Sequence, residues 1–136
     1  MRGGDKQWHK DAGKPRVDLI PPLPLFQIGH VLAFGMEKYG FRNWEQYADH
    51  WNWGDLLGST MRHVFAWMAG EDRDHESGLH HLSHALCDLM MLVQLILCSS
   101  GTDDRTPLRP EEFGPGGVAM FHTVGTNVRR GAKKRR

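Results

Sequence analysis

The sequence predicts an all-α protein in which antiparallel helices form a bundle and several chains assemble as an oligomer. Apolar residues recur at helical spacing in three stretches, at about residues 23–39, 55–69 and 78–98. A short polar turn joins the second and third stretches, so these two should run antiparallel. Beyond Asp88 the third stretch is apolar on nearly every side, which predicts burial against another subunit.

The composition fits an acidic domain with a basic end. At 136 residues the chain is expected to form a single core. Six of its 17 Lys and Arg residues lie in residues 129–136, which leaves 11 of them against 16 Asp and Glu residues, a net charge of −5, in residues 1–128. We divide the chain into a domain with an N-terminal arm, residues 1–98, and an irregular arm with a basic tail, residues 99–136. The tail is expected to bind nucleic acid weakly at most.

Cysteine usage and hydropathy indicate a cytoplasmic protein. Cys87 and Cys98 fall on one predicted helix, about 16 Å apart along its axis, which is too far for a disulfide within the chain. No signal-peptide pattern opens the sequence, and its longest apolar run, residues 89–98, is shorter than the about 20 residues that span a bilayer. We therefore expect no membrane association.

The first 20 residues lack a helical period and are expected to form a loop. Within them, Lys14 and Arg16 stand close to Gly13, and a flexible glycine beside two cations suits the binding of phosphate oxygens. A solvated basic loop is the alternative, which the spacing alone favours. The proline-rich residues 21–24 then mark the start of the first helix, and Gly40 ends it.

The connection over residues 41–53 holds three tryptophans, which are costly to leave in water. Packing in the core or at a subunit interface would explain them, and so would an aromatic wall for a purine ring. Trp44 is the better candidate for stacking, because Arg42 and Asn43 adjoin it. The sequence leaves both interpretations open.

The turn between the second and third helices, residues 71–78, is strongly charged. Gly70 ends the second helix, and Asp74 or Ser77 is expected to cap the third. The expected core stripes are Leu57, Met61, Val64 and Met68 on the second helix and Leu82, Leu86, Leu89 and Val93 on the third. Charge this close to a predicted core needs a reason.

A strip of ionisable side chains continues from the turn onto the third helix. At about 100° per residue, His81, His84 and Asp88 lie within about 60° of one another around the helix. The strip borders the leucine stripe, at the edge of the core. The antiparallel arrangement predicts that His81 lies near Glu71 and that the other two side chains face residues 62–67.

Three explanations compete for this cluster. The first is a network of hydrogen bonds and ion pairs between helices, such as Arg62 with Asp88 and His84 with a carbonyl. The second is a site in which carboxylates from both helices hold Mg²⁺ or Mn²⁺, ions that prefer oxygen ligands. The third is zinc, which ranks last because the sequence has no HExxH motif and no paired Cys and His spacing. The pattern alone leaves the first two open.

Four motifs in order carry a specific resemblance. They are DAGKPRVDLIPP at residues 11–22, FGMEKYGFRNW at 34–44, RHVFAWMAGEDRDHESGLHHLSHAL at 62–86 and DLMMLVQL at 88–95. Through them the chain resembles the phage and bacterial dATP/dGTP diphosphohydrolases of the MazG-like, all-α NTP pyrophosphatase superfamily. The resemblance extends to the MazZ type, which is found in phages that replace adenine with 2-aminoadenine.

The resemblance implies hydrolysis of a purine (deoxy)nucleoside triphosphate, preferably dGTP and also dATP, to the monophosphate and pyrophosphate. It also implies two or more Mg²⁺ or Mn²⁺ ions per site, a homotetramer, and a role in phage nucleotide metabolism in the host cytoplasm. The superfamily's Glu-x-x-Asp motif is altered here, because Asp88 matches its Asp whereas Ala85 replaces its Glu. The only literal Glu-x-x-Asp is Glu71 to Asp74, in the turn.

These considerations give each candidate residue an expected role. The candidates for the catalytic base are Glu71 and His81. The candidate metal ligands are Glu37, Glu71, Asp74, His84 and Asp88. The candidate substrate-binding residues are Lys14, Arg16, Lys38 and Arg62 for the phosphates, Asn43 and Trp44 for the base, and His63. Glu37 and Lys38 are expected at the end of the first helix that is far from the turn, where they would act across a subunit interface.

Other functions fit parts of the pattern. One is a house-cleaning NTP pyrophosphatase with a different base preference, and another is a non-enzymatic helical module that binds nucleic acid or assembles through the basic tail. A phosphohydrolase of the HD type needs an adjacent His-Asp pair. This chain has Asp49-His50 and Asp74-His75 in the reverse order, which argues against that class.

Overall fold

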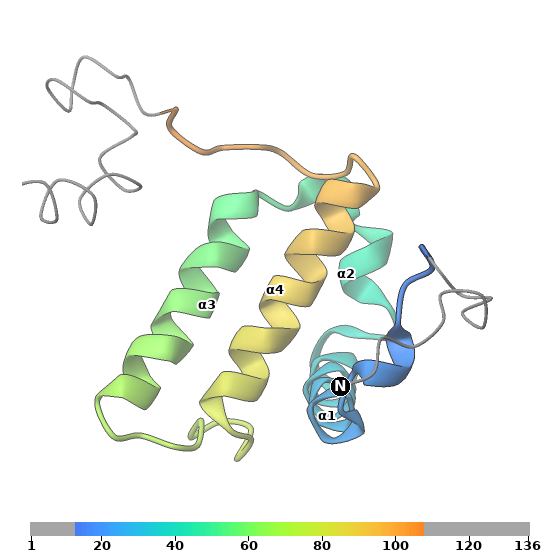
Figure 1. Cartoon of the computed structure of the whole chain (residues 1–136). Helices are drawn as coiled ribbons and strands as arrows, with labels where there is room; N and C mark the ends of the chain where they lie inside the picture. The colour runs from blue at the N-terminus through green and yellow to red at the C-terminus, as the bar shows by residue number, and fades with distance from the viewer. Residues whose placement is uncertain (1–12, 108–136) are drawn as a thin grey trace, which may run out of the picture. The chain divides into compact units, whose positions relative to one another are not determined.

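The computed structural model describes residues 13–107, and its regular elements are helices (Figure 1). In chain order they are the 3₁₀ turn η2 (Val17–Leu19), α1 (Pro22–Tyr39), α2 (Asn43–Gln46), the 3₁₀ turn η3 (Ala48–His50), α3 (Trp53–Met68) and α4 (His81–Leu97). Over the described range no β-strand forms, and β pairing is limited to isolated bridges. The all-α prediction is confirmed.

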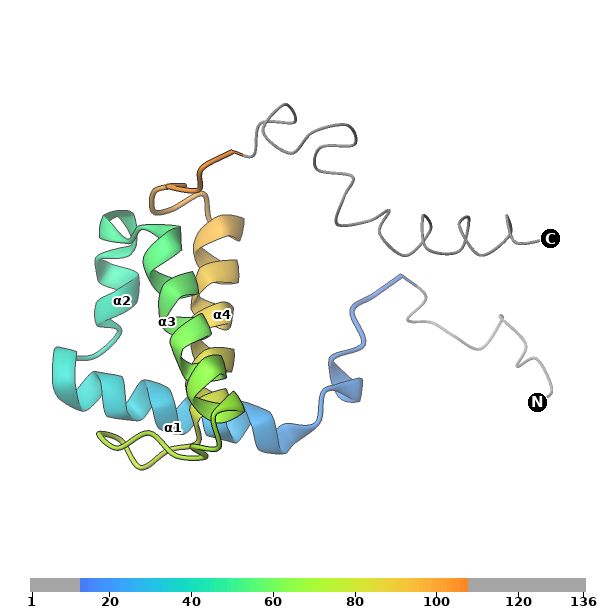
Figure 2. The ribbon, with the colours of Figure 1, turned by 90° about the vertical axis from the view of Figure 1, so that its left-hand side faces the viewer.

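The two long C-terminal helices form an antiparallel pair, as the short turn between them predicts. α3 and α4 lie side by side in both views, and their contact is the most extensive between any two elements (Figures 1 and 2). α1 packs mainly on α4 and crosses the pair steeply instead of running along it (Figure 2). The crossing brings the C-terminal end of α1 toward the turn between α3 and α4.

The core lies where α1 and α3 meet α4. Its buried side chains are Ile28 and Val31 of α1, Leu56 of α3, and Cys87, Met91 and Leu95 of α4. The expected core stripes on α3 and α4 were therefore wrong by about one position around each helix. Leu86, Leu89 and Val93 remain 40–53% exposed, because the apolar half of α4 offers more than one face for burial.

The turn delays the start of α4. The predicted third helix began at residue 78, whereas α4 begins at His81. The intervening backbone is held by other bonds, since Asp74 N–H donates to the Leu79 carbonyl at 2.8 Å and His81 N–H donates to the Asp72 carbonyl at 2.9 Å. The predicted caps were wrong as well, because Nδ1 of His80 accepts the bond from the Leu82 N–H at 3.1 Å.

The aromatic connection packs on the core. Trp44 and Trp51 are half-buried against the core cluster, and the Trp51 indole donates to the Trp44 carbonyl at 3.2 Å. Trp53 opens α3, and its indole donates to the Ser100 carbonyl at 3.0 Å. Packing thus accounts for these rings within one chain, and the stacking role of Trp44 remains a prediction.

Residues 99–102, just after α4, are fastened to the start of α3. The Thr102 N–H donates to the Trp51 carbonyl at 2.8 Å, and the Trp53 N–H donates to the Thr102 carbonyl at 3.0 Å. This part of the chain belongs to one compact unit ending at Thr102, and residues 103–107 belong to a second. The predicted basic tail lies outside the described residues.

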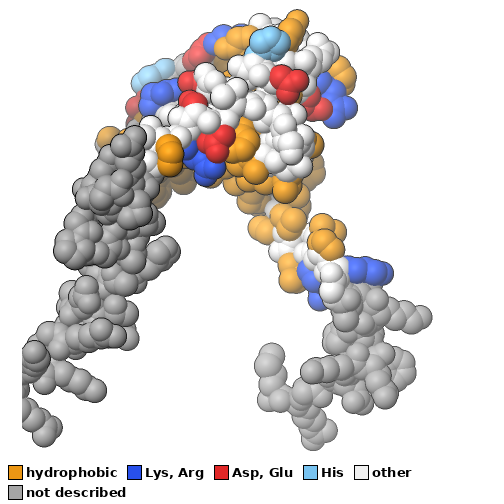
Figure 3. Space-filling view, turned by 90° about the horizontal axis from the view of Figure 1, so that it is seen from above, with side chains coloured by type: hydrophobic (Ala, Val, Ile, Leu, Met, Phe, Trp, Pro, Cys, Tyr) orange, Lys and Arg blue, Asp and Glu red, His pale blue; other side chains and the backbone are white. Residues whose placement is uncertain are grey.

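Large apolar side chains remain exposed to solvent on all three long helices. Figure 3 shows hydrophobic side chains intermixed with charged ones on the visible face. Among the exposed ones are Phe26 on α1, Phe65 on α3 and Val93 and Leu97 on α4. None of the helices described is long and apolar enough to cross a membrane. Both cysteines are free thiols, as predicted, with Cys87 buried and Cys98 exposed.

Candidate functional site

The charged turn and the first two turns of α4 close around a cluster of imidazoles and carboxylates. His63 comes from α3, Glu71 and Asp74 from the turn, and His81 and His84 from α4. The residues enter from three segments because the antiparallel pair brings the end of α3 to the start of α4 (Figure 1). We call these five residues the histidine–carboxylate cluster.

His81 is the most enclosed member of the cluster. Its ring is 5% exposed, and its Nδ1 lies 2.9 Å from Nδ1 of His63. Its Nε2 is buried without a hydrogen-bond partner and faces Oε1 of Glu71 at 3.6 Å. The same oxygen lies 2.5 Å from Nε2 of the exposed His75. The prediction that His81 lies near Glu71 is confirmed.

His84 is held through Ser77, which the sequence analysis considered only as a cap of the third helix. Oγ of Ser77 donates to Oδ1 of Asp74 at 3.0 Å and accepts from the Leu79 N–H at 3.1 Å. Nε2 of His84 lies 2.6 Å from the same Oγ, and which of the two atoms donates depends on the tautomer of the ring.

The two helices also bring His63 and His84 together. Their rings stack with centroids 4.6 Å apart and planes 11° from parallel. Burial lowers the pKa of both histidines below its ordinary value, and for His63 the neighbouring His84 adds to the shift. Both rings are therefore neutral near pH 7, the form in which imidazole binds a metal.

Asp88 lies farther along α4 than His84, and hydrogen bonds satisfy its carboxylate only in part. Its Oδ2 is buried and has no hydrogen-bond partner. Burial raises the pKa of Asp88, against the opposing effects of a bond from Ser59 and of His63, His84 and Arg62. An uncompensated buried carboxylate oxygen is costly unless a cation or a proton meets it.

The C-terminal end of α1 reaches the same turn, which corrects one expectation. Lys38 forms an ion pair with Glu76, and Phe34 places the edge of its ring against His84 with centroids 6.4 Å apart. Glu37 and Lys38 were predicted at the end of the first helix far from the turn. The steep crossing of α1, which helical periodicity does not encode, places that end beside the turn instead.

The remaining predicted residues are spread over the chain. Arg62 is exposed on α3 on the side of Asp88, and Asn43 and Trp44 open the short helix α2. Lys14 and Arg16 precede the other end of α1, which at 18 residues is about 27 Å long. Arg16 is already paired with Asp18, both of its bonds being 2.6–2.8 Å long. One chain thus does not gather all the predicted phosphate-binding cations around the cluster.

Sequence reasoning gave no role at the site to four supporting residues: Phe34, Ser59, Glu76 and Ser77, the last of which was considered only as a helix cap. Ser77 had a local signal, because an Asp three residues before a Ser favours a side-chain-capped turn. Phe34 and Glu76 had none, since their contacts depend on the crossing of α1. Phe34, Glu76 and Ser77 contact members of the cluster, whereas Ser59 bonds Asp88, which lies outside it.

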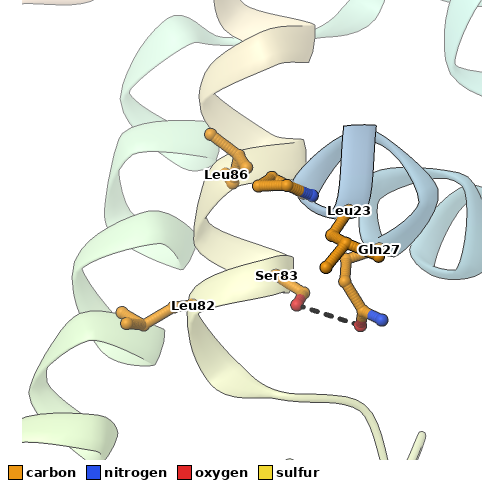
Figure 4. A pocket seen from close by; sticks show the side chains of 6 residues that line it. Leu23, Gln27, Leu82, Ser83 and Leu86 are labelled. Carbon is orange, nitrogen blue, oxygen red and sulfur yellow. Dashed lines mark hydrogen bonds between the residues drawn. The ribbon is translucent and has the colours of Figure 1, made fainter. Parts of the chain in front are cut away.

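Ligand atoms of His63, Asp74 and His81 all lie within 4.8 Å of one another, so the three could hold a metal ion. A separate open pocket of about 270 Å³ lies between α1 and α4 (Figure 4). Leu23, Gln27, Ser83 and Leu86 line it, with Oγ of Ser83 donating to Oε1 of Gln27 at 3.4 Å. None of its lining residues is ionisable, so it is a different feature from the cluster.

Comparison with known proteins now assigns the chain. Residues 5–105 match the family described as dATP/dGTP diphosphohydrolase, N-terminal. This chain belongs to that family. The matched residues span helices α1 to α4 and all five residues of the histidine–carboxylate cluster.

One relative supports the assignment. The chain is 37% identical over 95 residues to a protein named dATP/dGTP diphosphohydrolase from Salmonella phage PMBT28. The match covers 70% of this chain but spans only 31% of that relative's length. No solved structure matches the chain.

Proposed function

We propose that this chain hydrolyses a purine deoxynucleoside triphosphate, dGTP or dATP, to the monophosphate and pyrophosphate in a metal-dependent reaction. The observation that carries the proposal is the buried histidine–carboxylate cluster within the region matched by the dATP/dGTP diphosphohydrolase family. We further propose dGTP as the preferred substrate and a role in phage nucleotide metabolism that supports 2-aminoadenine DNA. The name of the relative supports the substrate class only.

The cluster fits a divalent metal. Ligand atoms of His63, Asp74 and His81 already converge, and Oδ2 of Asp88 is a buried oxygen without a hydrogen-bond partner. Mg²⁺ or Mn²⁺, two or more per site, would be held by carboxylates of Glu71, Asp74 and Asp88. When bound, such ions neutralise phosphate charge and acidify water.

Residues of this chain would accept the proton from water and bind the phosphates. Glu71 is positioned to accept a proton from water, because its carboxylate is half-exposed and faces both His75 and His81. Water attack on a phosphorus of the α–β linkage breaks that P–O bond, so the products are a nucleoside monophosphate and pyrophosphate. Lys38 and Arg62, at the two sides of the cluster, are the nearest candidates for binding phosphate.

We also propose that the active species is a homo-oligomer with the bundle type of the MazG-like superfamily, a tetramer by resemblance. Two features support more than one chain. Apolar side chains stay exposed along α3 and α4, and Lys14 and Arg16 lie at the opposite end of α1 from Lys38. A second chain could cover the exposed apolar side chains. It could also bring Lys14 and Arg16 to the histidine–carboxylate cluster of a neighbouring chain.

A substrate panel tests the proposed function. Purified chain, stripped with EDTA and resupplied with Mg²⁺ or Mn²⁺, is incubated with the four dNTPs and with ATP and GTP, and products are separated by ion-exchange chromatography. We expect monophosphate and pyrophosphate from dGTP and dATP at the highest kcat/KM, with no turnover in EDTA. Equal turnover of pyrimidine and purine substrates would contradict the substrate class.

A further inference from the structure

Two histidine rings from different helices bring their Nδ1 atoms close together. Nδ1 of His63 and Nδ1 of His81 lie 2.9 Å apart, on side chains from α3 and α4. Metal–nitrogen bonds of about 2.1 Å hold two ligand nitrogens about 3.0 Å apart when the bonds meet at a right angle and about 3.4 Å apart when they meet at the tetrahedral angle. The two rings therefore already stand at the separation of neighbouring ligands on one ion.

Nε2 of His81, the ring nitrogen that does not face His63, lies beside a carboxylate. Only one hydrogen fits between the two Nδ1 atoms, and the carboxylate of Glu71 stands 3.6 Å from Nε2 of His81. A negative carboxylate favours the tautomer with its hydrogen on that Nε2, which leaves Nδ1 of His81 as an acceptor. A metal-bound histidine commonly donates its second N–H to a carboxylate, and the Glu71 carboxylate stands just beyond hydrogen-bond distance of this nitrogen.

Asp74 supplies the third ligand from the turn. Its Oδ1 accepts bonds from the Glu76 N–H at 3.2 Å, the Ser77 N–H at 2.9 Å and the Ser77 hydroxyl at 3.0 Å. These bonds fix the carboxylate and all reach the same oxygen. One carboxylate oxygen of Asp74 lies within 4.8 Å of a ring nitrogen of His63 and of a ring nitrogen of His81.

We propose that His63, His81 and Asp74 bind one transition-metal ion that favours imidazole, such as Co²⁺, Ni²⁺ or Zn²⁺, in preference to Mg²⁺. Two imidazoles and one carboxylate suit such ions, whereas Mg²⁺ favours an all-oxygen shell. Three protein ligands leave coordination positions open for water or phosphate. The inference deepens the proposed function and rests on it for the role of the ion, but not for binding itself.

Binding of Co²⁺ to the full-length, metal-free chain tests the proposal without nucleotide. Titration is followed by visible absorption and by calorimetry, with Mg²⁺ titrated separately. We expect one tight Co²⁺ ion per chain and Mg²⁺ binding at least about 100-fold weaker. Glu71→Gln should weaken Co²⁺ by about 10- to 100-fold, the usual effect of losing an outer partner, and His63→Gln and His81→Gln by more.

His50→Gln is the matched control, because His50 is exposed and contacts Tyr47 instead of the cluster. It should bind Co²⁺ like the wild type. Unchanged Co²⁺ affinity in both His63→Gln and His81→Gln, with helix content retained by circular dichroism, would overturn the proposal. Equal affinity for Mg²⁺ and Co²⁺ would do the same.

A measurement on the unaltered chain guards against variants that fail to fold. Zn²⁺ is added to protein labelled with ¹⁵N, and the ring nitrogens are followed by NMR. We expect the Nδ1 signals of two histidines to move to metal-bound values, and one of the two to disappear in His63→Gln. Coordination through Nε2 instead would overturn the proposed geometry.

The two proposals can fail separately. Hydrolysis of dGTP with Mg²⁺ alone, together with no histidine-dependent Co²⁺ binding, would refute the metal site and leave the proposed function standing. Tight Co²⁺ binding through the two histidines, with no hydrolysis of any nucleotide under any metal, would refute the proposed function and support the site.

Discussion

Glu71 is the side chain on which the proposed chemistry depends most. Its carboxylate faces Nε2 of His81. The side chain is also half-exposed, so water and substrate can reach it. Glu71→Gln keeps the shape but removes both the base and the negative charge. We expect kcat to fall by about 10²- to 10⁴-fold, measured as pyrophosphate release from dGTP.

Glu45→Gln is the control for this change, because Glu45 pairs with Arg42 on α2. It should retain wild-type turnover. Circular dichroism and thermal melting should show both variants folded. Full activity in Glu71→Gln would show that the base has been assigned to the wrong carboxylate.

Asp88 gives a prediction about pH and stability. Burial raises its pKa in the folded chain, so the unfolded chain holds this proton less tightly than the folded chain does. The contribution of Asp88 to stability is therefore fully present below its unfolded pKa, about 3.9, and is lost as pH rises through the folded value. Asp88→Asn should then be more stable than the wild type at pH 7 in EDTA, although less active.

Urea unfolding at pH 7 and pH 4, at equal protein concentration, measures this effect. The stabilisation of Asp88→Asn should shrink at pH 4, because more of the wild-type carboxyl is protonated there than at pH 7. Asp55→Asn, an exposed acid in the first turn of α3, serves as the comparison. A variant that is less stable than the wild type at pH 7 would show that the carboxylate is stabilised by its surroundings.

At the scale of the elements, Gly101 locks the segment after α4 onto the start of α3. Its φ is +79°, and an added Cβ would lie 2.8 Å from the Trp51 carbonyl oxygen and 3.1 Å from the Trp53 indole nitrogen. Gly101→Ala should destabilise the fold by about 1–3 kcal/mol, the usual cost of backbone strain of this kind, measured by denaturant unfolding.

Gly29→Ala is the matched comparison, since Gly29 is helical and a Cβ there meets nothing within 4 Å. Alanine should stabilise α1 by up to about 1 kcal/mol. If Gly101→Ala were as stable as Gly29→Ala, the contact between residues 99–102 and α3 would contribute little.

The sequence predicts the positions of the helices better than it predicts which face of each helix is buried. Periodicity and the glycines at 40 and 70 predicted three long helices and the antiparallel pair, because these signals are local. Periodicity did not identify the buried face of α4, because residues 89–97 are apolar except for Gln94 and both Met91 and Val93 are apolar candidates for burial. The start of α4 was missed because hydrogen bonds within the turn, made by Asp72 and Asp74, hold residues 74–80 outside the helix.

The site shows the same division. His81 beside Glu71, and His84 and Asp88 facing α3, followed from helical geometry and a short turn. The contacts of Lys38 with Glu76 and of Phe34 with His84 depend on how α1 crosses α4. That angle is set by the summed packing of many side chains, which no local pattern reports.

At the scale of the whole molecule, the exposed apolar surface predicts self-association. Val93 on α4 is 53% exposed, and a charge there would oppose burial against a second chain. Val93→Glu should lower the mass found by sedimentation equilibrium toward that of one chain. Gln94→Glu, one position along and also exposed, should keep the wild-type mass. Equal masses for the two variants would place the interface elsewhere.

The products formed from dGTP reveal which phosphate bond the chain cleaves. Full-length chain and dGTP are incubated with Mn²⁺, and all phosphorus-containing products are identified by ion-exchange chromatography against standards. The account predicts dGMP and pyrophosphate in equal amounts, and neither in EDTA. Formation of dGDP and phosphate, of deoxyguanosine and triphosphate, or of no product with any divalent metal would contradict it.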